Sequence, residues 1–384
     1  MDRIDRFLEL RARGGLRREL HPISYRKNGK IVLKGKEYID FSSNDYLGLA
    51  GHPRLVEAAK VALDRFGTGS SASRLLSGDL ELHHRLEDET SRFKGKEAAL
   101  VFNSGYQANL GLFSALYGKG DVIFSDRLNH ASIVDGILLS QAAAFRFRHN
   151  DVNHLKGLLK KERKKFKNAL IVTETIFSMD GDRPPLGDLV ELKARYDCAI
   201  MVDEAHATGI YGPRGAGVVE EEGKVSEVDL IMGTFSKALG SFGGYLAGPT
   251  KVIDFLINRC RSFIYSTALP PGIIASSLEA LKLVKEEPHR RTELLGRARY
   301  FRKRLKGMGF NVKGESQIVP LVTGENSKTI NSAGTLQEKG WWVMPIRPPT
   351  VPKNEARLRF SLSFHQDLKT LERLLNDIKS YVKI

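Results

Sequence analysis

The sequence has 384 residues, of which 41% are hydrophobic and 27% are charged. These proportions are typical of a globular chain long enough for two or three domains, and they exclude disordered and collagen-like proteins. Lysine and arginine together number 60 and aspartate and glutamate 45, so the formal net charge is +15. This excess admits nucleic acid, an anionic membrane or an acidic small molecule as a partner without deciding among them.

Cysteine content and hydropathy limit the cellular setting. Cys198 and Cys260 are the only two cysteines, so a disulfide-stapled secreted scaffold and a Cys-rich zinc module are excluded. The charged N-terminus lacks the apolar core of a signal peptide, and no run approaches the roughly 18 apolar residues of a membrane span. We therefore expect a cytoplasmic protein with no membrane contact and no metal site.

The predicted elements alternate regularly from about residue 98, after an irregular N-terminal part. Charges alternating with Ile4, Phe7 and Leu8 predict a short amphipathic helix that is interrupted at Gly14 and Gly15. Short apolar strands then alternate with helix-length segments, at 98–102, 121–125, 143–147, 169–173, 198–202, 230–233 and 244–247. Continuous apolar strands separated by helices predict an α/β fold with a mostly parallel sheet between layers of helices.

The last hundred residues alternate more loosely. Strands are expected at 318–322, 342–346 and 357–362, and leucines at helical spacing predict a helix over 368–382. This pattern indicates a smaller α+β domain. We divide the chain into an N-terminal segment (1–45), a large domain (46–285) and a small C-terminal domain (286–384).

Polar residues follow five of the predicted strands directly. They occur at 103–106, at 125–126 with His130, at 173–174 with Ser178, at 203–206 and at 234–237. In an open α/β sheet, ligands bind beyond the carboxyl ends of the strands. One such segment is an ordinary turn, but five at the same edge predict a ligand site.

Lys237 stands among small residues immediately after one of these strands, in the segment 234–244 (TFSKALGSFGG). One interpretation is a helix N-terminus whose lysine extends to solvent. The other is a desolvated amine that forms a Schiff base with an aldehyde cofactor. The hydroxyls of Thr234 and Ser236 are suited to a phosphate.

Asp203 closes an apolar strand, where a carboxylate is costly to bury without a positive partner. The protonated ring nitrogen of pyridoxal phosphate (PLP) is such a partner, and capping of a helix is the alternative. The sequence Asp-Glu-Ala-His at 203–206 also matches the magnesium motif of one class of helicases. That interpretation fails because no Gly-Lys pair in the chain is followed by Ser or Thr, as a phosphate loop requires.

The segment Ser104-Gly105-Tyr106 precedes a helical pattern at 107–116. Backbone N–H groups at a helix N-terminus, beside a glycine that permits close approach, are suited to a phosphate. The flat ring of Tyr106 or His130 can cover an aromatic ring, although a solvated histidine is the ordinary interpretation of a lone His130. The histidine pair at 83–84 is expected on an exposed helix.

Taken together, these segments resemble the fold-type I PLP enzymes, and within them the α-oxoamine synthases, over residues 16–365. The wider resemblance is carried by 234–244, with further landmarks at 41–49, 149–151, 177–182 and 346–352. The α-oxoamine synthases join an amino acid to an acyl thioester and release carbon dioxide. Segments 41–49 and 346–352 look most like the biotin-pathway branch, which condenses L-alanine with a pimeloyl thioester of coenzyme A or acyl carrier protein.

The resemblance implies a role for each residue of the cofactor site. Lys237 would hold PLP as a Schiff base and later move the α-proton of the substrate, while Asp203 would pair with the ring nitrogen. His206 would contact the phenolic oxygen with Ser178 close by, and His130 would stack on the ring. The phosphate group would be held by Gly105, Tyr106, Thr234, Ser236 and Thr267, the last from a partner subunit of a homodimer.

The resemblance also implies substrate contacts. Asn44 and Arg347 would receive the amino-acid carboxylate, a task suited to the bidentate fork of arginine. Arg17, with its neighbour Arg18 as the alternative, and Thr350 match positions that contact the acyl chain. His130 would face the substrate as well as the cofactor.

Three other functions remain open at this stage. A glycine C-acetyltransferase of the same family would use glycine and acetyl-CoA, and a plain aminotransferase would need no thioester. A nucleic-acid-binding protein would exploit the net charge directly. Much of that charge lies in 156–167 and 290–306, and leucines at 155, 158 and 159 make the first of these segments a solvated helix face. An acidic thioester is therefore expected as the partner, and nucleic acid is not.

Overall fold

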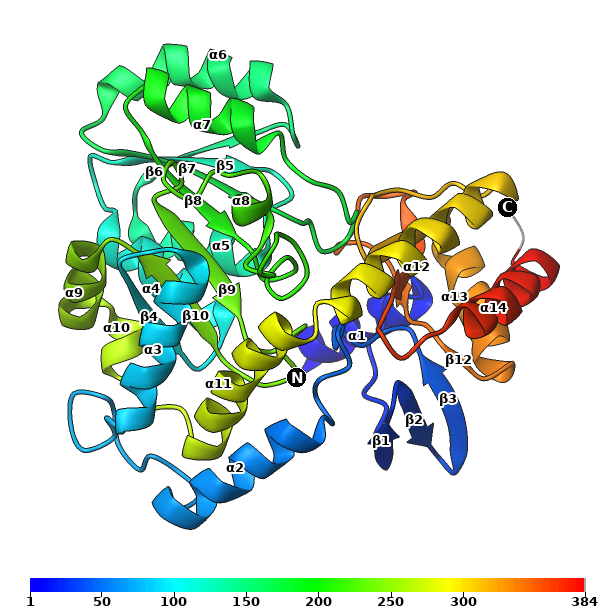
Figure 1. Cartoon of the computed structure of the whole chain (residues 1–384). Coiled ribbons are helices and arrows are strands. Elements are labelled where there is room, and N and C mark those ends of the chain that lie inside the picture. The colour runs from blue at the N-terminus through cyan, green and yellow to red at the C-terminus, as the bar shows by residue number, and fades with distance from the viewer. Residues whose placement is uncertain (383–384) are drawn as a thin grey trace. The chain divides into compact units, whose positions relative to one another are not determined.

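The computed structural model describes residues 1–382 (Figure 1). The chain divides into two compact units. Unit 1 contains residues 1–48, 179–182 and those from 292 onward, and unit 2 contains 49–178 and 183–291. The N-terminal 48 residues and the C-terminal residues thus belong to the same unit. Within residues 1–382, no helix combines the length and the apolar character that crossing a membrane requires.

Unit 2 is built on a seven-stranded sheet with the order β4-β10-β9-β8-β7-β5-β6. Every neighbouring pair is parallel except those of β10, which runs antiparallel to both β4 and β9. The predicted mostly parallel sheet is confirmed, with strand ends within one residue of those expected. The strands are β4 (Ala98–Phe102), β5 (Val122–Asp126), β6 (Ala143–Phe147), β7 (Ala169–Glu174), β8 (Ala199–Asp203), β9 (Leu230–Thr234) and β10 (Gly244–Gly248).

Local signals in the sequence explain where several helices of unit 2 begin. The side chains of Ser104, His130 and Asp151 each accept a backbone N–H of the helix that follows, which satisfies a donor without an intrahelical partner. The helices are α2 (Pro53–Phe66), α3 (Glu81–Lys94), α4 (Gly105–Leu116), α5 (Ala131–Ser140), α6 (Val152–Glu162), the 3₁₀ turn η1 (Arg163–Lys165), α7 (Leu186–Arg195), α8 (Val218–Glu221), α9 (Thr250–Arg259), α10 (Arg261–Ile264) and α11 (Pro271–Glu286).

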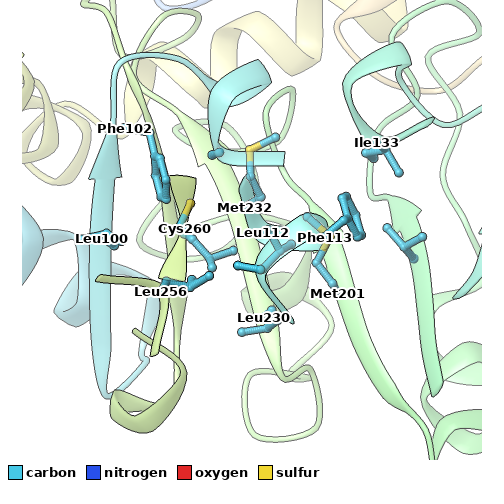
Figure 2. Close-up of a cluster of buried hydrophobic side chains, with 14 of the residues drawn as sticks. Leu100, Phe102, Leu112, Phe113, Ile133, Met201, Leu230, Met232, Leu256 and Cys260 are labelled. Carbon is cyan, nitrogen blue, oxygen red and sulfur yellow. The ribbon is translucent and has the colours of Figure 1, made fainter. Parts of the chain in front are cut away.

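The sheet of unit 2 is buried on both faces except at its edge strand β6, where Ala144 and Arg146 are exposed. On one face Phe102 of β4 and Met232 of β9 belong to a buried hydrophobic cluster with Leu112 of α4, shown in Figure 2. On β10, Leu246 joins that cluster while its neighbour Tyr245 meets Lys94 of α3, because successive strand residues point to opposite faces. Burial on both faces is the reason that the strands read as continuous apolar runs.

A buried ion pair joins α3 to the segment after β8. Lys94, the last residue of α3, pairs with Glu204, and the two side chains are 1% and 0% exposed. The Lys94 ammonium also donates to the carbonyl of Ala216 and lies 3.4 Å from the Thr208 hydroxyl. Buried charges of this kind are tolerated only with full pairing, so the pair holds the residue next to Asp203 in one place.

Two surface expectations have different outcomes. The lysines of 156–167 are exposed while Leu155 and Leu159 are buried, which confirms a solvated helix face. The prediction that the histidine pair at 83–84 is exposed is wrong for His83, which is 1% exposed. The His83 ring turns inward to accept the backbone N–H of Leu80 at 3.1 Å, and burial lowers its pKa to about 4.

Unit 1 contains two smaller sheets, ordered β1-β2-β3-β12 and β11-β14-β13. Their strands are β1 (Tyr25–Lys27), β2 (Lys30–Leu33), β3 (Lys36–Asp40), β11 (Ile318–Gly324), β12 (Trp341–Trp342), β13 (Pro345–Ile346) and β14 (Ala356–Ser361). The helices are α1 (Asp2–Arg13), α12 (His289–Gly307), α13 (Asn326–Glu338) and α14 (Leu368–Tyr381), and the first residues of α12 belong to unit 2. As expected, α1 ends at Gly14.

The prediction of a single strand at 342–346 is wrong. The chain instead forms β12, which pairs parallel with β3, and β13, which pairs antiparallel with β14. Between them the backbone N–H of Met344 donates to the Ser42 hydroxyl at 3.1 Å rather than to a strand. The segment therefore leaves one sheet and enters the other.

Candidate functional site

The polar residues singled out in unit 2 gather at one edge of its sheet. Strands β4, β9, β8, β7 and β5 all point the same way, so the residues that follow them lie at a common edge. Because β10 is antiparallel, its first residue, Gly244, lies at this edge too. The sheet topology thus brings together five segments that are far apart in the sequence.

Lys237 lies in the connection between β9 and β10. This connection is closed at its base, where Thr234 pairs with Gly244 and the N–H of Phe235 donates to Gly243 at 3.0 Å. The Lys237 amine lies 2.8 Å from Nε2 of His206. At this distance the amine and the imidazole nitrogen share a hydrogen bond, so His206 orients the side chain of Lys237.

Asp203, the last residue of β8, is 5% exposed. One carboxylate oxygen accepts the backbone N–H of Ala205 at 2.9 Å, and the other accepts the amide of Asn109 at 3.2 Å. Asn109 lies on α4, and its amide also donates to Ser132 at 2.9 Å. These neutral donors orient the carboxylate without supplying a positive charge.

Two further polar groups surround this carboxylate. Glu174 ends β7 in register with Asp203, and burial followed by the Asp203 charge raises the pKa of Glu174 well above its usual range. His130 begins α5 with its Nδ1 beside the Ser132 hydroxyl at 2.8 Å. Desolvation lowers the pKa of His130, although the residue as a whole is exposed. An imidazole ring is flat and can stack on an aromatic ligand.

The start of α4 forms a cradle beside the base of the Lys237 connection. A Cβ added to Gly244 would lie 2.5 Å from the backbone N of Gly105, so the two chain segments touch without side chains. The first-turn N–H groups of Gly105 and Tyr106 precede the first intrahelical bond, from Ala108 to Ser104. The Thr234 hydroxyl lies 3.0 Å from that of Ser236. N–H groups and hydroxyls in this arrangement suit a phosphate.

For two of the expected cofactor contacts, Ser178 and Thr267, the hydrogen bonds described above do not fix a position beside Lys237. Ser178 is half-buried and is the last residue of unit 2 before the 179–182 segment. Thr267 is exposed, forms an isolated β-bridge with Ser73, and its carbonyl accepts the Asn103 amide at 2.8 Å. The exposed position of Thr267 leaves its hydroxyl accessible from outside unit 2.

The residues at this edge fit PLP. An amine for the aldehyde, a buried carboxylate for the ring nitrogen and a helix N-terminus for the phosphate are all provided by unit 2. Two buried oxygens, Oδ1 of Asn109 and Oε1 of Glu174, have no hydrogen-bond partner in the described structure, and buried polar atoms are rarely left so. Within residues 1–382, no three His, Cys, Asp or Glu side chains form a group suited to a metal ion.

In unit 1, three arginines line a pocket of about 670 Å³ together with Thr350. Arg18 donates to the Thr350 hydroxyl at 3.2 Å, whereas Arg17 lies 3.9 Å from Glu19. Arg347 donates to the Gly15 carbonyl, and burial together with the charge of Arg18 lowers its pKa. Like charges gathered in one pocket favour an anionic ligand.

Asn44 lies beside Arg359, an arginine that the sequence analysis did not single out. Its side-chain oxygen accepts the Tyr46 hydroxyl at 3.0 Å and both terminal nitrogens of Arg359 at 3.4 Å. Arg359 is 8% exposed and also donates to the Ser361 hydroxyl at 2.6 Å. The geometry therefore groups Asn44 with Arg359, and Arg347 with Arg18 and Thr350.

A doubly wound sheet with a lysine, an aspartate and a phosphate cradle at its carboxyl edge is the arrangement of the fold-type I PLP enzymes. The model of the family described as aminotransferase class I and II matches residues 36–378. The chain therefore belongs to this family.

Individual relatives and solved structures within this family are similar to the chain over most of its length. A protein from Geobacter sulfurreducens named 8-amino-7-oxononanoate synthase is 50% identical over 362 residues, which cover 94% of this chain and 92% of the relative. A solved 8-amino-7-oxononanoate synthase from Francisella tularensis is 29% identical with a TM-score of 0.77 and covers 89% of this chain and 97% of its own. A serine palmitoyltransferase variant from S. paucimobilis with a bound PLP–myriocin adduct is 30% identical, with a TM-score of 0.94 and coverages of 99% and 96%.

We expect Lys237→Ala to abolish the visible absorbance of covalently held PLP, because it removes the amine that lies 2.8 Å from Nε2 of His206 at the cofactor edge. Turnover should fall by several orders of magnitude while the far-UV circular dichroism stays unchanged. Absorption spectra of the purified variant, reconstituted with PLP, provide the measurement. Lys156→Ala, on the exposed face of α6, is the control, and retained absorbance in Lys237→Ala would contradict the assignment.

Proposed function

We propose that this protein catalyses the decarboxylative condensation of L-alanine with a pimeloyl thioester in biotin biosynthesis. The products are 8-amino-7-oxononanoate, carbon dioxide and the free thiol carrier, either coenzyme A or acyl carrier protein. The observation that carries the proposal is the Lys237–His206 contact beside Asp203. The curated relatives named 8-amino-7-oxononanoate synthase support the choice of L-alanine and a pimeloyl thioester as the substrates.

When bound, PLP supplies an aldehyde that condenses with amines and a ring that accepts the electron pair left on the amino-acid Cα. Asp203 provides the negative charge for the ring nitrogen, oriented by Asn109. His130 would cover the ring, and His206 with Ser178 would contact its phenolic oxygen. Backbone at Gly105 and Tyr106 and the hydroxyls of Thr234, Ser236 and Thr267 would hold the phosphate.

Lys237 is the group that moves the proton. Its Nζ takes the Cα proton of alanine, and the electron pair of that bond then attacks the thioester carbonyl carbon. The carbonyl re-forms as the C–S bond breaks and the thiolate leaves. Loss of carbon dioxide from the resulting β-keto acid leaves an electron pair on the same carbon, which takes a proton back before the product departs.

The two groups of residues in unit 1 are proposed to bind two different anions. Asn44 and Arg359 receive the carboxylate of alanine, and Arg347 with Arg17, Arg18 and Thr350 binds the acidic acyl substrate. This assignment moves Arg347 from the amino-acid carboxylate to the acyl substrate, because Asn44 contacts Arg359 while Arg347 lines the pocket with Arg18.

We expect Arg359→Lys and Arg347→Lys to raise different Michaelis constants. Loss of a bidentate guanidinium costs about 1.5 kcal/mol or more, which corresponds to roughly a tenfold rise in KM. Arg359→Lys should raise KM for alanine and Arg347→Lys that for the thioester, in steady-state assays with each substrate varied. If Arg347→Lys instead raises KM for alanine alone, Arg347 rather than Arg359 binds its carboxylate.

A paired substrate assay tests the proposed function directly. We expect the purified enzyme with PLP to release thiol from alanine plus pimeloyl-CoA at a kcat/KM at least about 100-fold above that for glycine plus acetyl-CoA, because a buried site that matches one substrate discriminates by a few kcal/mol. Mass spectrometry identifies the amino-ketone product. Preference for glycine and acetyl-CoA would make the enzyme a glycine C-acetyltransferase.

The protein is further proposed to act as a cytoplasmic homodimer. Both cysteines are buried thiols without a disulfide, as is usual in a reducing compartment. Large apolar side chains of unit 2 are left exposed, among them Leu76 at 77% and Tyr265 at 72%. Ser73, near Leu76, pairs with Thr267 in a β-bridge, so Thr267 lies beside an apolar surface that a second copy would cover.

We expect multi-angle light scattering to give twice the mass of one chain, because exposed apolar surface of this kind is stabilised by burial against a partner. Leu76→Asp should weaken the dimer and lower PLP affinity together if Thr267 acts across the interface. Leu8→Asp, on the solvent-exposed α1, is the control. A fully active wild-type monomer would contradict this arrangement.

A further inference from the structure

Glu174 is a buried carboxyl group at the cofactor edge for which the proposed mechanism has no use. It ends β7, directly beside Asp203 of β8, and is 3% exposed. Residues paired in register on neighbouring parallel strands point to the same face. Two carboxyl groups therefore lie side by side at the edge where Asp203 serves the ring nitrogen.

The contacts of Glu174 are asymmetric. The backbone N–H of His130 donates to its carboxyl group. The other oxygen, Oε1, is buried and has no hydrogen-bond partner in the described structure. The carboxyl group thus holds the backbone of His130, and its Oε1, beside Asp203, is left without a partner among the described residues.

The charges that face Glu174 are those of Asp203, Lys237 and Asp126. Both aspartates oppose a negative charge on Glu174, whereas Lys237 favours one. Burial opposes it most of all and holds the pKa of Glu174 well above its usual value. Two buried carboxylates side by side are strongly unfavourable, so one of them keeps a proton.

We propose that Glu174 is a positioning residue that acts as a neutral acid. It holds the N–H of His130 and keeps a second negative charge away from Asp203. Asp203 then provides the only ionised carboxylate on this pair of strand ends. This inference rests on the proposed function, because it concerns the same PLP site.

Two substitutions of similar size separate the neutral acid from an ionised one. Glu174→Gln keeps a neutral polar group that accepts from His130, whereas Glu174→Met fills the same volume without a hydrogen bond. The readouts are the PLP affinity of the apoenzyme, from titration by absorbance, and the pH midpoint of the visible band of the reconstituted enzyme. Glu162→Gln, a buried carboxyl on α6, is the control, and the thermal midpoint of each apoenzyme reports on folding.

We expect Glu174→Gln to retain PLP affinity within about twofold and the pH midpoint within about 0.3 units. Glu174→Met should weaken PLP binding about tenfold, the order of one lost buried hydrogen bond. If Glu174 were ionised, Glu174→Gln would remove a negative charge and lower the pH midpoint by about one unit. Such a shift, or wild-type affinity in Glu174→Met, would overturn the inference. If the wild-type protein itself bound no PLP, the proposed function would fail instead.

Discussion

Parallel pairing of strands in unit 2 is the constraint on which the candidate site depends. It places the ends of β5, β7, β8 and β9 at one edge, so that His130, Asp203 and Lys237, which come from three separate segments, gather at the candidate site. The ion pair of Lys94 with Glu204 holds the residue next to Asp203 from the opposite side of the sheet. Packing on both faces, as Figure 2 shows for the α4 face, keeps the strands in register.

Much of this site is predictable from the sequence because its signals are local. An apolar run followed at once by polar residues marks a strand end, and Asp203 and Lys237 both occur there. The strand boundaries follow from the same pattern. The chemical identity of the cofactor depended instead on the resemblance of whole segments to a known family, because an aspartate or a lysine after a strand has ordinary structural interpretations.

What the sequence did not reveal depends on contacts between distant segments. Asn109 reads as an ordinary residue of α4 until its amide is seen beside Asp203. Arg359 lies on an apolar strand and is placed beside Asn44 only by the fold of unit 1. The burial of His83 and the change of sheet after Trp342 likewise depend on contacts with distant segments, which local sequence patterns do not predict. Register between β7 and β8 was also needed to relate Glu174 to Asp203.

The antiparallel course of β10 has a consequence for how the reactive amine is held. A lysine on a crossover loop would be tethered to the sheet at one end, whereas the segment with Lys237 returns at once to the neighbouring strand. Hydrogen bonds from Ser241 to Phe235 and from Gly240 to Lys237 cross the loop inside that closure. The backbone of this segment therefore loses its conformational entropy when the protein folds. Only the side chain of Lys237 is left to search for its target in each catalytic cycle, which shortens the approach to a reactive geometry.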